Sequence, residues 1–455
     1  MRPRRRGPMP TPHSRPSQRT SAAPRIWKWF DVLLKSYLFL PSAVVAAGIV
    51  LAIAVGTADG TELVSSEAFP KWMRFQDPVA ARIALTTIAG AAITIVSLTF
   101  SISIVVMTLA TSQFGPRVLA SFLRDRVNQV VLGVFLATFV YCLLAIVSVG
   151  LRDGESDPPQ LTLTVALALS LGSIAALIFF LHHIADSIQA STIVDRLARD
   201  LDSILARSTS DEHEPERDDG GPDPPRDARP LISSRAGTLQ AIDVDALASL
   251  AQDRDAEVWL ARRVGGFVPE GGVLAHVRGP ADDELADAVR ATLILGSERT
   301  PVQDLELGFD RLAEVALRAL SPGINDPFTA MSCIDRLANG LGGLACRGAP
   351  PTVVRDGDGA PRIHVDVGNF ASLAEAAFGP IRVCGRGHPA VMTRLLDALA
   401  TLAPVVRTDA QLDVLLEQAR VAHEIAHRHA ETDPDRRGLD RGLAGVETAV
   451  RRARG

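Results

Sequence analysis

The feature that most constrains this chain is an uncharged stretch longer than a bilayer requires. Residues 83–116 contain no Asp, Glu, Lys or Arg, and the stretch ends at Gly115-Pro116. A helix of this length, rising about 1.5 Å per residue, would reach roughly 50 Å, whereas the hydrocarbon core is about 30 Å thick. We therefore expect a membrane helix that tilts or projects from the bilayer, and that the proline ends.

One face of this predicted helix carries small and hydroxyl-bearing residues, beside an aliphatic row that includes Ile88 and Ile95. Such a face lets membrane helices approach closely. It also suits the wall of a water-filled pore, because polar surface at that depth must meet protein or water. Both interpretations stay open. We call this set the hydroxyl seam, and its members are Thr87, Gly90, Thr94, Ser97, Ser101, Thr108 and Thr111.

A short basic segment follows the break. In residues 117–126, apolar side chains share one helical face and arginines lie largely opposite. This arrangement is typical of a helix in the headgroup layer, where arginines meet anionic lipid. The residues expected at the turn and the headgroups are Gly115, Pro116, Arg117, Arg124 and Arg126.

Three more apolar runs complete a four-helix transmembrane domain over residues 25–181. The predicted spans are about 37–56, 82–112, 127–149 and 161–181, after a disordered basic N-terminus at 1–24. We expect the first span to stay uncleaved, because it is longer than a signal peptide and further spans follow. Basic residues gather before the first span and at 117–126. The positive-inside rule then predicts a multi-pass inner-membrane protein with both termini in the cytoplasm.

Two blocks of sequence resemble one family. They are FSISIVVMTLATSQFGPRVLASFLRDRVNQVVLGVFLATFVYCLL (Phe100 to Leu144) and RTPVQDLELGFDRLAEVALRALSPGINDPFTAMSCIDRL (Arg299 to Leu337). Both are similar to the signatures of bacterial predicted membrane proteins known as domain of unknown function 2254. The likeness covers most of residues 27–402. It implies a bacterial plasma-membrane protein with a cytosolic domain, and it implies no reaction, because the family's activity is not established.

The rest of the chain predicts a soluble region. We expect an amphipathic stalk at 182–207, an acidic disordered linker at 208–235, a cytosolic α+β domain at 236–430 and a C-terminal helix with a basic tail at 431–455. Three alternating runs predict a small β-meander, at Thr238 to Ile242, Glu257 to Val264 and Gly272 to Val277.

The charge composition excludes several functions. The net charge of −5 gives no sign of a nucleic-acid partner. The lysines are Lys28, Lys35 and Lys71, so the soluble region has none. A phosphate-binding Walker lysine, a Schiff base and a lipoylated lysine are therefore excluded there. We expect no cofactor.

A turn near the middle of the soluble region is a candidate ligand site. Asp326 followed by Pro327 predicts a helix start, and helix N-termini attract anions. A small anionic ligand would then bind at a corner formed by Arg299, Ser321, Gly323, Asn325 and Asp326. A rigid helix–turn–helix corner without a ligand explains the same residues.

One short motif is typical of zinc peptidases. His423, Glu424 and His427 match H-E-x-x-H, whose two histidines share a helix face and whose glutamate activates water. Glu447 is the candidate third ligand. The alternative is an exposed, metal-free helix, because the motif lies outside the two resembling blocks and its surroundings are polar.

Together these features favour a non-enzymatic protein. We expect a homo-oligomeric assembly in the lipid bilayer, with an ion or solute pathway gated by the cytosolic domain. A membrane-tethered sensor or scaffold, binding an anionic ligand or a protein at residues 321–329, is the first alternative. A zinc metallopeptidase is the second.

Overall fold

A computed structural model describes residues 39–59, 74–75, 77–115, 125–151, 158–208, 223–280, 282–348 and 350–455. These residues fall into two compact units. The first is drawn from residues 1–102 and 123–181, and the second from 103–122 and 182–455. The predicted N-terminal segment 1–24 and the turn residues Pro116, Arg117 and Arg124 lie outside the described residues.

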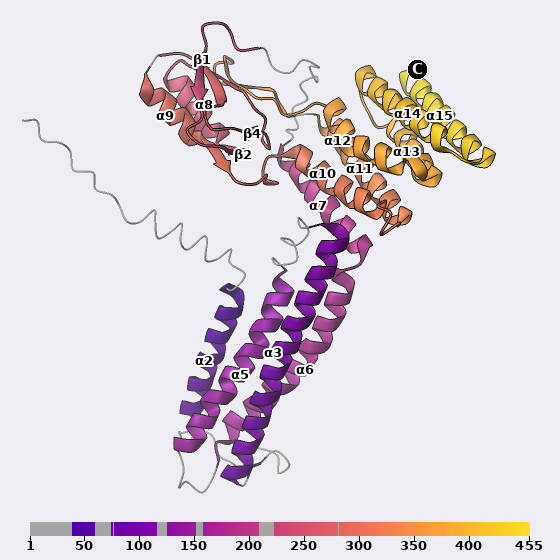
Figure 1. Cartoon of the computed structure of the whole chain (residues 1–455). Helices are drawn as coiled ribbons and strands as arrows, with labels where there is room; N and C mark the ends of the chain where they lie inside the picture. The colour runs from indigo at the N-terminus through magenta and orange to yellow at the C-terminus, as the bar shows by residue number, and fades with distance from the viewer. Residues whose placement is uncertain are drawn as a thin grey trace, which may run out of the picture. The chain divides into compact units, whose positions relative to one another are not determined.

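Four long apolar helices form the first unit. They are α2 (Phe39–Ala58), α3 (Pro78–Phe114), α5 (Arg126–Leu151) and α6 (Gln160–Ser187), and Figure 1 shows them side by side. Each is long and apolar enough to cross a membrane. α3 passes into the second unit after residue 102, and α6 does so after residue 181. The four predicted membrane helices are confirmed.

α2 and α5 make the closest helix contact of the first unit. A Cβ atom added to Gly48 would lie 2.9 Å from the Cβ of Ala137, and one added to Gly133 would lie 2.9 Å from the Cβ of Val44. Real Cβ atoms do not approach so closely, so both positions require glycine. Small residues at the contact allow the two backbones to pack where lipid supplies no hydrophobic drive.

Hydrogen bonds tie the first and last of these helices together where α2 ends and α6 begins. The Asp59 carboxylate accepts the backbone N–H groups of Leu161 (3.0 Å) and Thr162 (2.7 Å). It thereby satisfies donors that a helix N-terminus leaves without partners. The Tyr141 hydroxyl, buried on α5, donates to the carbonyl oxygen of Thr162 at 3.1 Å. Polar contacts therefore join α2, α5 and α6 at this end of the bundle.

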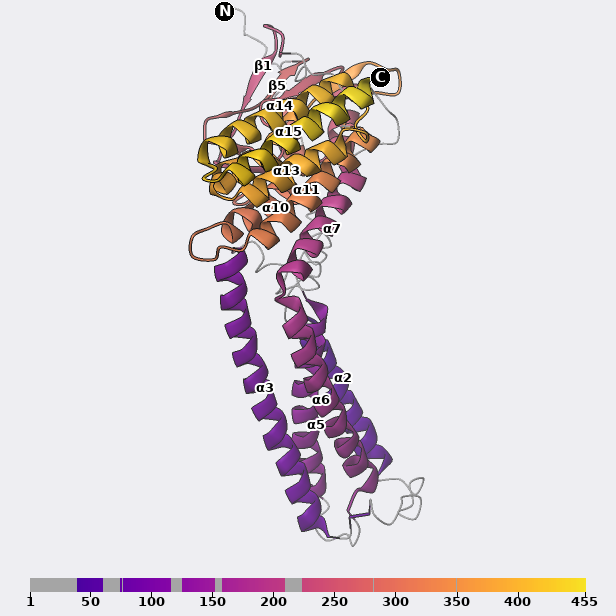
Figure 2. The same ribbon diagram turned by 90° about the vertical axis from the view of Figure 1, so that its right-hand side faces the viewer.

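Most of the second unit is helical. Its long helices are α7 (Ala190–Ser208), α10 (Leu305–Ala319), α11 (Pro327–Arg347), α12 (Phe370–Cys384), α13 (Pro389–Leu402), α14 (Asp409–His429) and α15 (Asp433–Arg454). Figure 2 shows α10, α11, α13 and α15 following one another, and α14 packs against both α13 and α15. One core cluster runs through these helices, and Leu312, Leu337, Phe378 and Leu395 are fully buried in it.

α7 is part of this core, which changes the interpretation of the predicted stalk. The apolar face of α7 is buried. Leu201 lies so close to α10 and α11 that a Cβ on Gly308 or Gly340 would come within 2.7 or 2.6 Å of its methyl groups. The helix is strongly amphipathic because it packs against two others, and it is not a free-standing stalk.

The strands form two sheets beside two short helices, α8 (Val244–Asp253) and α9 (Asp283–Thr292). One sheet has the order β1-β5-β3-β8-β7 and the other β4-β2-β6. The strands are β1 (Arg229–Ile232), β2 (Gly237–Ile242), β3 (Glu257–Leu260), β4 (Phe267–Val268), β5 (Val273–Arg278), β6 (Leu293–Gly296), β7 (Val353–Arg355) and β8 (Pro361–His364).

Two details differ from the sequence prediction. The three runs predicted as a meander all contain strands, but β2 lies in the smaller sheet, whereas β3 and β5 pair in the larger one. The linker predicted to end at residue 235 ends earlier, because β1 pairs with β5. The predicted fold class, four membrane helices followed by an α+β domain, is confirmed.

Candidate functional site

The hydroxyl seam lies on the side of α3 that the described part of the chain leaves uncovered. Thr87, Gly90, Thr94, Ser97, Ser101 and Thr108 are exposed, and Thr111 is half-buried. The residues of α3 that are buried in the first unit are Ala81, Leu85, Ala89, Ala92, Val96 and Thr99. At about 100° per residue, these two sets point in nearly opposite directions. One face of α3 therefore packs within the chain, and the opposite face is available to something else.

Five of the six hydroxyl groups of the seam are paired with their own helix. Thr87 donates to the carbonyl oxygen of Ile83 (2.8 Å) and Thr94 to that of Gly90 (2.8 Å). Ser97, Thr108 and Thr111 make the same four-residue contact at 2.8–3.1 Å. The donor protons therefore need no partner across the surface. With these hydroxyls paired, the seam is nearly apolar, so it can be buried against another helix at little cost. The larger side chains Ile83, Ile104 and Val105 are exposed beside it.

The turn after α3 is positioned by the second unit. Gly115 has φ +97°, and a Cβ there would lie 2.8 Å from Glu314 Oε1 and 2.9 Å from Arg318 Nε. Phe114 belongs to the core of that unit. Arg126 is exposed at the start of α5. The headgroup interpretation of residues 117–126 stays a prediction.

Helix-capping contacts occupy the predicted ligand corner. Asp326 Oδ1 accepts the backbone N–H of Thr329 at 3.1 Å, and Oδ2 accepts the Thr329 hydroxyl at 2.5 Å. Asn325 adopts φ +50°, and the Ser321 hydroxyl donates to the carbonyl oxygen of Arg318 at 2.6 Å. Gly323 is in open space. Cap chemistry accounts for this corner without a ligand.

Arg299 does not join that corner, which corrects the predicted grouping. It donates to both carboxylate oxygens of Asp304 (2.7 and 2.8 Å) and to Asp310 (2.7 Å). These contacts lie at the start of α10, whereas the corner follows its end, about 22 Å further along a helix of this length. The hydrogen bond to Asp304, whose side chain is 1% exposed, raises the pKa of Arg299. The side chain is a structural ion-pair partner.

A cavity of about 430 Å³ lies beside this ion pair. Arg207 and Arg263 bring positive charge to its wall, and Asp304, Glu306 and Asp366 bring negative charge. Arg263 binds Glu306 at 2.7 Å. Burial raises the pKa of the Glu306 carboxyl. The sequence did not indicate this cavity, since its lining comes from segments far apart in the chain. Its apolar wall includes Ile242, Val244, Val264, Val302, Val365 and Val367.

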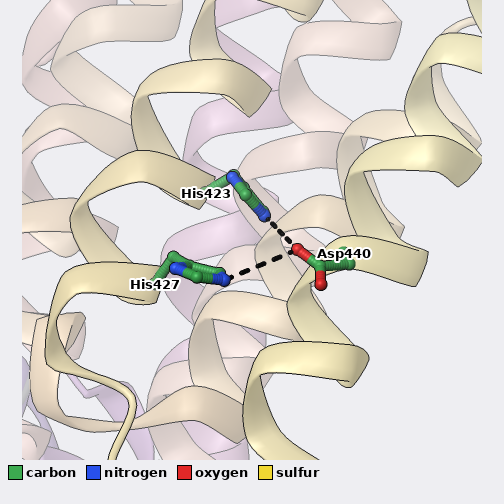
Figure 3. Close-up of side chains that lie close together, drawn as sticks. All are labelled: His423, His427 and Asp440. Carbon is green, nitrogen blue, oxygen red and sulfur yellow. Dashed lines mark hydrogen bonds and ion pairs between the residues drawn. The ribbon is translucent and has the colours of Figure 1, made fainter. Parts of the chain in front are cut away.

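The two histidines of the H-E-x-x-H motif meet an aspartate on the next helix (Figure 3). His423 and His427 extend from α14 toward Asp440 on α15. Asp440 Oδ1 lies 2.8 Å from His423 Nε2 and 3.8 Å from His427 Nε2. The ring centroids are 5.2 Å apart. One ligand atom from each of the three residues lies within 4.8 Å of the others.

The third partner is therefore Asp440 and not the predicted Glu447. Glu447 lies two helical turns further along α15, about 10 Å away. Glu424, which a peptidase would use to activate water, is 64% exposed and is ion-paired with Arg428. The arrangement offers a set of metal ligands, and it does not hold Glu424 at them as a general base.

Apolar membrane helices joined to an α+β unit define a multi-span membrane protein with a large soluble domain. The chain belongs to the family described as predicted membrane protein, domain of unknown function 2254, whose model matches residues 35–401. It is 35% identical over 420 residues to uncharacterized proteins of Mycobacterium bovis and Mycobacterium tuberculosis, covering 88% of this chain and 79% of each relative. No solved structure matches the chain. The histidine–aspartate cluster lies beyond the matched residues.

Proposed function

We propose that this protein is a non-enzymatic membrane assembly of several identical chains, which meet along the hydroxyl seam of α3. One observation carries the proposal: the seam lies opposite the face of α3 that packs within the chain, and the described residues leave it exposed. In our proposal, both termini and the second unit lie on the cytoplasmic side of the bacterial inner membrane, as the basic residues around 117–126 favour.

The physical argument rests on how membrane helices associate. Lipid tails are as apolar as leucine, so helices gain nothing by hiding large aliphatic side chains from them. Small side chains allow backbones to approach and gain dispersion contacts. This chain already uses that device where Gly48 and Gly133 join α2 to α5. A second copy of α3 fits the seam for the same reason.

Cysteine cross-linking in native membranes tests the contact. Thr94→Cys or Ser101→Cys, in a variant whose four native cysteines are replaced by alanine, should form disulfide-linked dimers under mild oxidation. Disulfides require Cβ atoms about 4 Å apart, so cross-linking reports direct contact. Leu171→Cys is the control, because Leu171 on α6 is 61% exposed and outside the seam. Equal cross-linking at the seam and at position 171 would reject the contact.

An ion or solute pathway is the stronger form of the proposal. If several α3 helices surround an axis, the seam lines it and the second unit gates it. Thr94→Leu or Ser101→Leu should then change ion flux into liposomes, because a larger apolar side chain would narrow and dewet the opening. If the variants assemble normally and the flux is unchanged, the proposed pathway is rejected, and the proposed assembly is not.

The cavity beside Asp304 supports a second candidate, a membrane-tethered sensor. Its apolar wall suits a small apolar molecule. Arg207 is the arginine of the lining that we propose meets one negative group of that molecule, since Arg263 is paired with Glu306. Asp304 and Asp366 also line the cavity. This site fits a ligand better than the 321–329 corner, whose polar atoms cap a helix. Medium-chain carboxylates should raise the melting temperature of the full chain in detergent. The shift should disappear in Val302→Trp, which fills the cavity, and an equal shift there would reject this site.

A further inference from the structure

We propose that His423, His427 and Asp440 bind one divalent transition-metal ion, of which Zn²⁺ is the type, and that the ion joins α14 to α15. The site is independent of the assembly proposed above, since it uses neither α3 nor any residue of the first unit. It also differs from a peptidase centre, because Glu424 is held by Arg428.

The positions of the ligand atoms support this proposal. In a tetrahedral zinc site with bonds of about 2.0–2.1 Å, neighbouring ligand atoms lie about 3.3 Å apart. The two distances from Asp440 to the imidazoles, 2.8 and 3.8 Å, lie on either side of that value. All three ligand atoms lie within 4.8 Å of one another, so side-chain rotations would have to close the widest separation by at most about 1.5 Å. The hydrogen bond between His423 and Asp440 would give way to two bonds to the ion.

The ligand types select the ion. Two imidazole nitrogens with one carboxylate oxygen suit Zn²⁺, whereas Mg²⁺ and Ca²⁺ prefer oxygen ligands. His427 is 41% exposed and Asp440 is 55% exposed. Solvent can therefore reach the cluster and complete the coordination with water.

Two rigid helices hold the ligands in register. On α14, Ala419, Ala422 and Ala426 are buried beside the histidines, and small side chains there let α15 approach closely. On α15, Leu439 is fully buried next to Asp440. α14 ends at His429 and α15 begins at Asp433, so a short turn joins them. An ion at this position would cross-link the last helical hairpin of the chain.

Metal titration of the full chain tests the site. The protein is purified in detergent with an affinity tag free of histidine, stripped with a chelator, and titrated with Zn²⁺ against a chromophoric competitor. We expect one ion per chain. His423→Ala and Asp440→Asn should each weaken binding at least about tenfold, because each removes one protein ligand of three. Co²⁺ in place of Zn²⁺ should give the visible absorption of a tetrahedral site in wild type alone.

Two histidine variants serve as matched controls. His429 lies on the same helix, and its ring nitrogen contacts the carbonyl oxygen of Ile425 at 2.9 Å, away from the cluster. His182 and Asp186 form another His–Asp pair at 3.4 Å. His429→Ala and His182→Ala should bind Zn²⁺ like wild type. If His182→Ala abolishes binding, or His423→Ala preserves it, or wild type binds no ion, the proposal is overturned.

Thermal unfolding gives a second readout. A ligand that binds only the folded state raises the melting temperature, and Zn²⁺ at 100 times its dissociation constant should raise that of wild type by roughly 3 °C. His423→Ala should show no such shift while melting normally without metal. Cross-linking of the Thr94→Cys variant along α3, with and without His423→Ala in the same chain, should not depend on Zn²⁺. The failure of one proposal is thereby distinguishable from the failure of the other.

Discussion

Two surfaces of the membrane unit carry small residues: the contact between α2 and α5, and the outer face of α3. The first is buried within the chain, and the second is exposed. Where α2 meets α5, Gly48 and Gly133 are covered so closely that a Cβ at either would clash. On the outer face of α3, a Cβ on Gly90 would meet nothing within 4 Å. The comparison teaches that small residues alone do not say which helix contact they serve. What matters is whether the chain itself supplies the partner.

Substitution of Gly133 by leucine should have the largest effect. The added Cβ would lie 2.9 Å from Val44 Cβ and 3.2 Å from the backbone of Pro41, which cannot move aside as a flexible side chain can. We expect a loss of about 1–3 kcal/mol or more in the free energy of unfolding, with poor recovery from membranes. Gly172→Leu is the control, because a Cβ on Gly172 meets nothing within 4 Å. Wild-type stability of Gly133→Leu would disprove the close α2–α5 contact.

Substitution of Gly90 by leucine should separate folding from assembly. Nothing in the described part of the chain opposes the new side chain, so the protomer should fold as well as wild type. The larger residue would hold two α3 helices apart, and the assembly should dissociate at least about tenfold more readily, the effect of a change near 1.4 kcal/mol. Light scattering of the detergent complex measures the mass. A normal assembly mass would place the contact on another face.

Replacement of Thr138 by valine measures what a polar contact adds inside the protomer. Its hydroxyl lies 3.0 Å from that of Ser173, and both are buried between α5 and α6. Hydrogen bonds between membrane helices contribute about 0.6 kcal/mol on average, so the loss should be well below that of Gly133→Leu. Reversible unfolding in mixed micelles gives the value. A loss above that of Gly133→Leu would mean that this hydrogen bond contributes more to the stability of the bundle than the close packing of α2 on α5.

Replacement of Thr94 by valine should have the smallest effect on assembly. Valine keeps the shape of threonine and removes a hydroxyl that already donates to the carbonyl oxygen of Gly90. If the seam is a packing surface, assembly should change by less than about 0.5 kcal/mol. If the seam faces water, flux should change while the mass stays the same. Mass and flux measured together distinguish the two uses.

The architecture was predictable because its signals are local. Apolar runs with few charges predict membrane helices, and all four appear within a few residues of their expected bounds, as α2 does at Phe39–Ala58. The helical spacing of apolar residues likewise predicts α10. The Asp326-Pro327 pair predicts that Asp326 caps the start of α11.

Contacts between distant segments were not predictable in this way. Gly48 and Gly133 are isolated glycines in apolar helices, with no repeat to mark them as partners. β8 pairs in parallel with β3 about a hundred residues earlier. The prediction therefore missed the larger sheet and misread β1 as linker.

The cluster of His423, His427 and Asp440 shows the same limit within one hairpin. Helical spacing alone places His423 and His427 on one face. The third ligand depends on where the chain turns between α14 and α15, which sets Asp440 opposite the histidines. The sequence analysis chose Glu447 as the third ligand, because the spacing of residues along the chain does not show how α14 and α15 align.

The carboxylate of Asp59 has one more consequence. It fastens the start of α6 to the end of α2, while Tyr141 fills the space beside it and bonds to the same residue, Thr162. Among the described residues, these hydrogen bonds hold α2, α5 and α6 together at this end. We therefore expect the proposed pathway to run along the boundary between neighbouring subunits, and a chain embedded singly in a vesicle should be electrically silent.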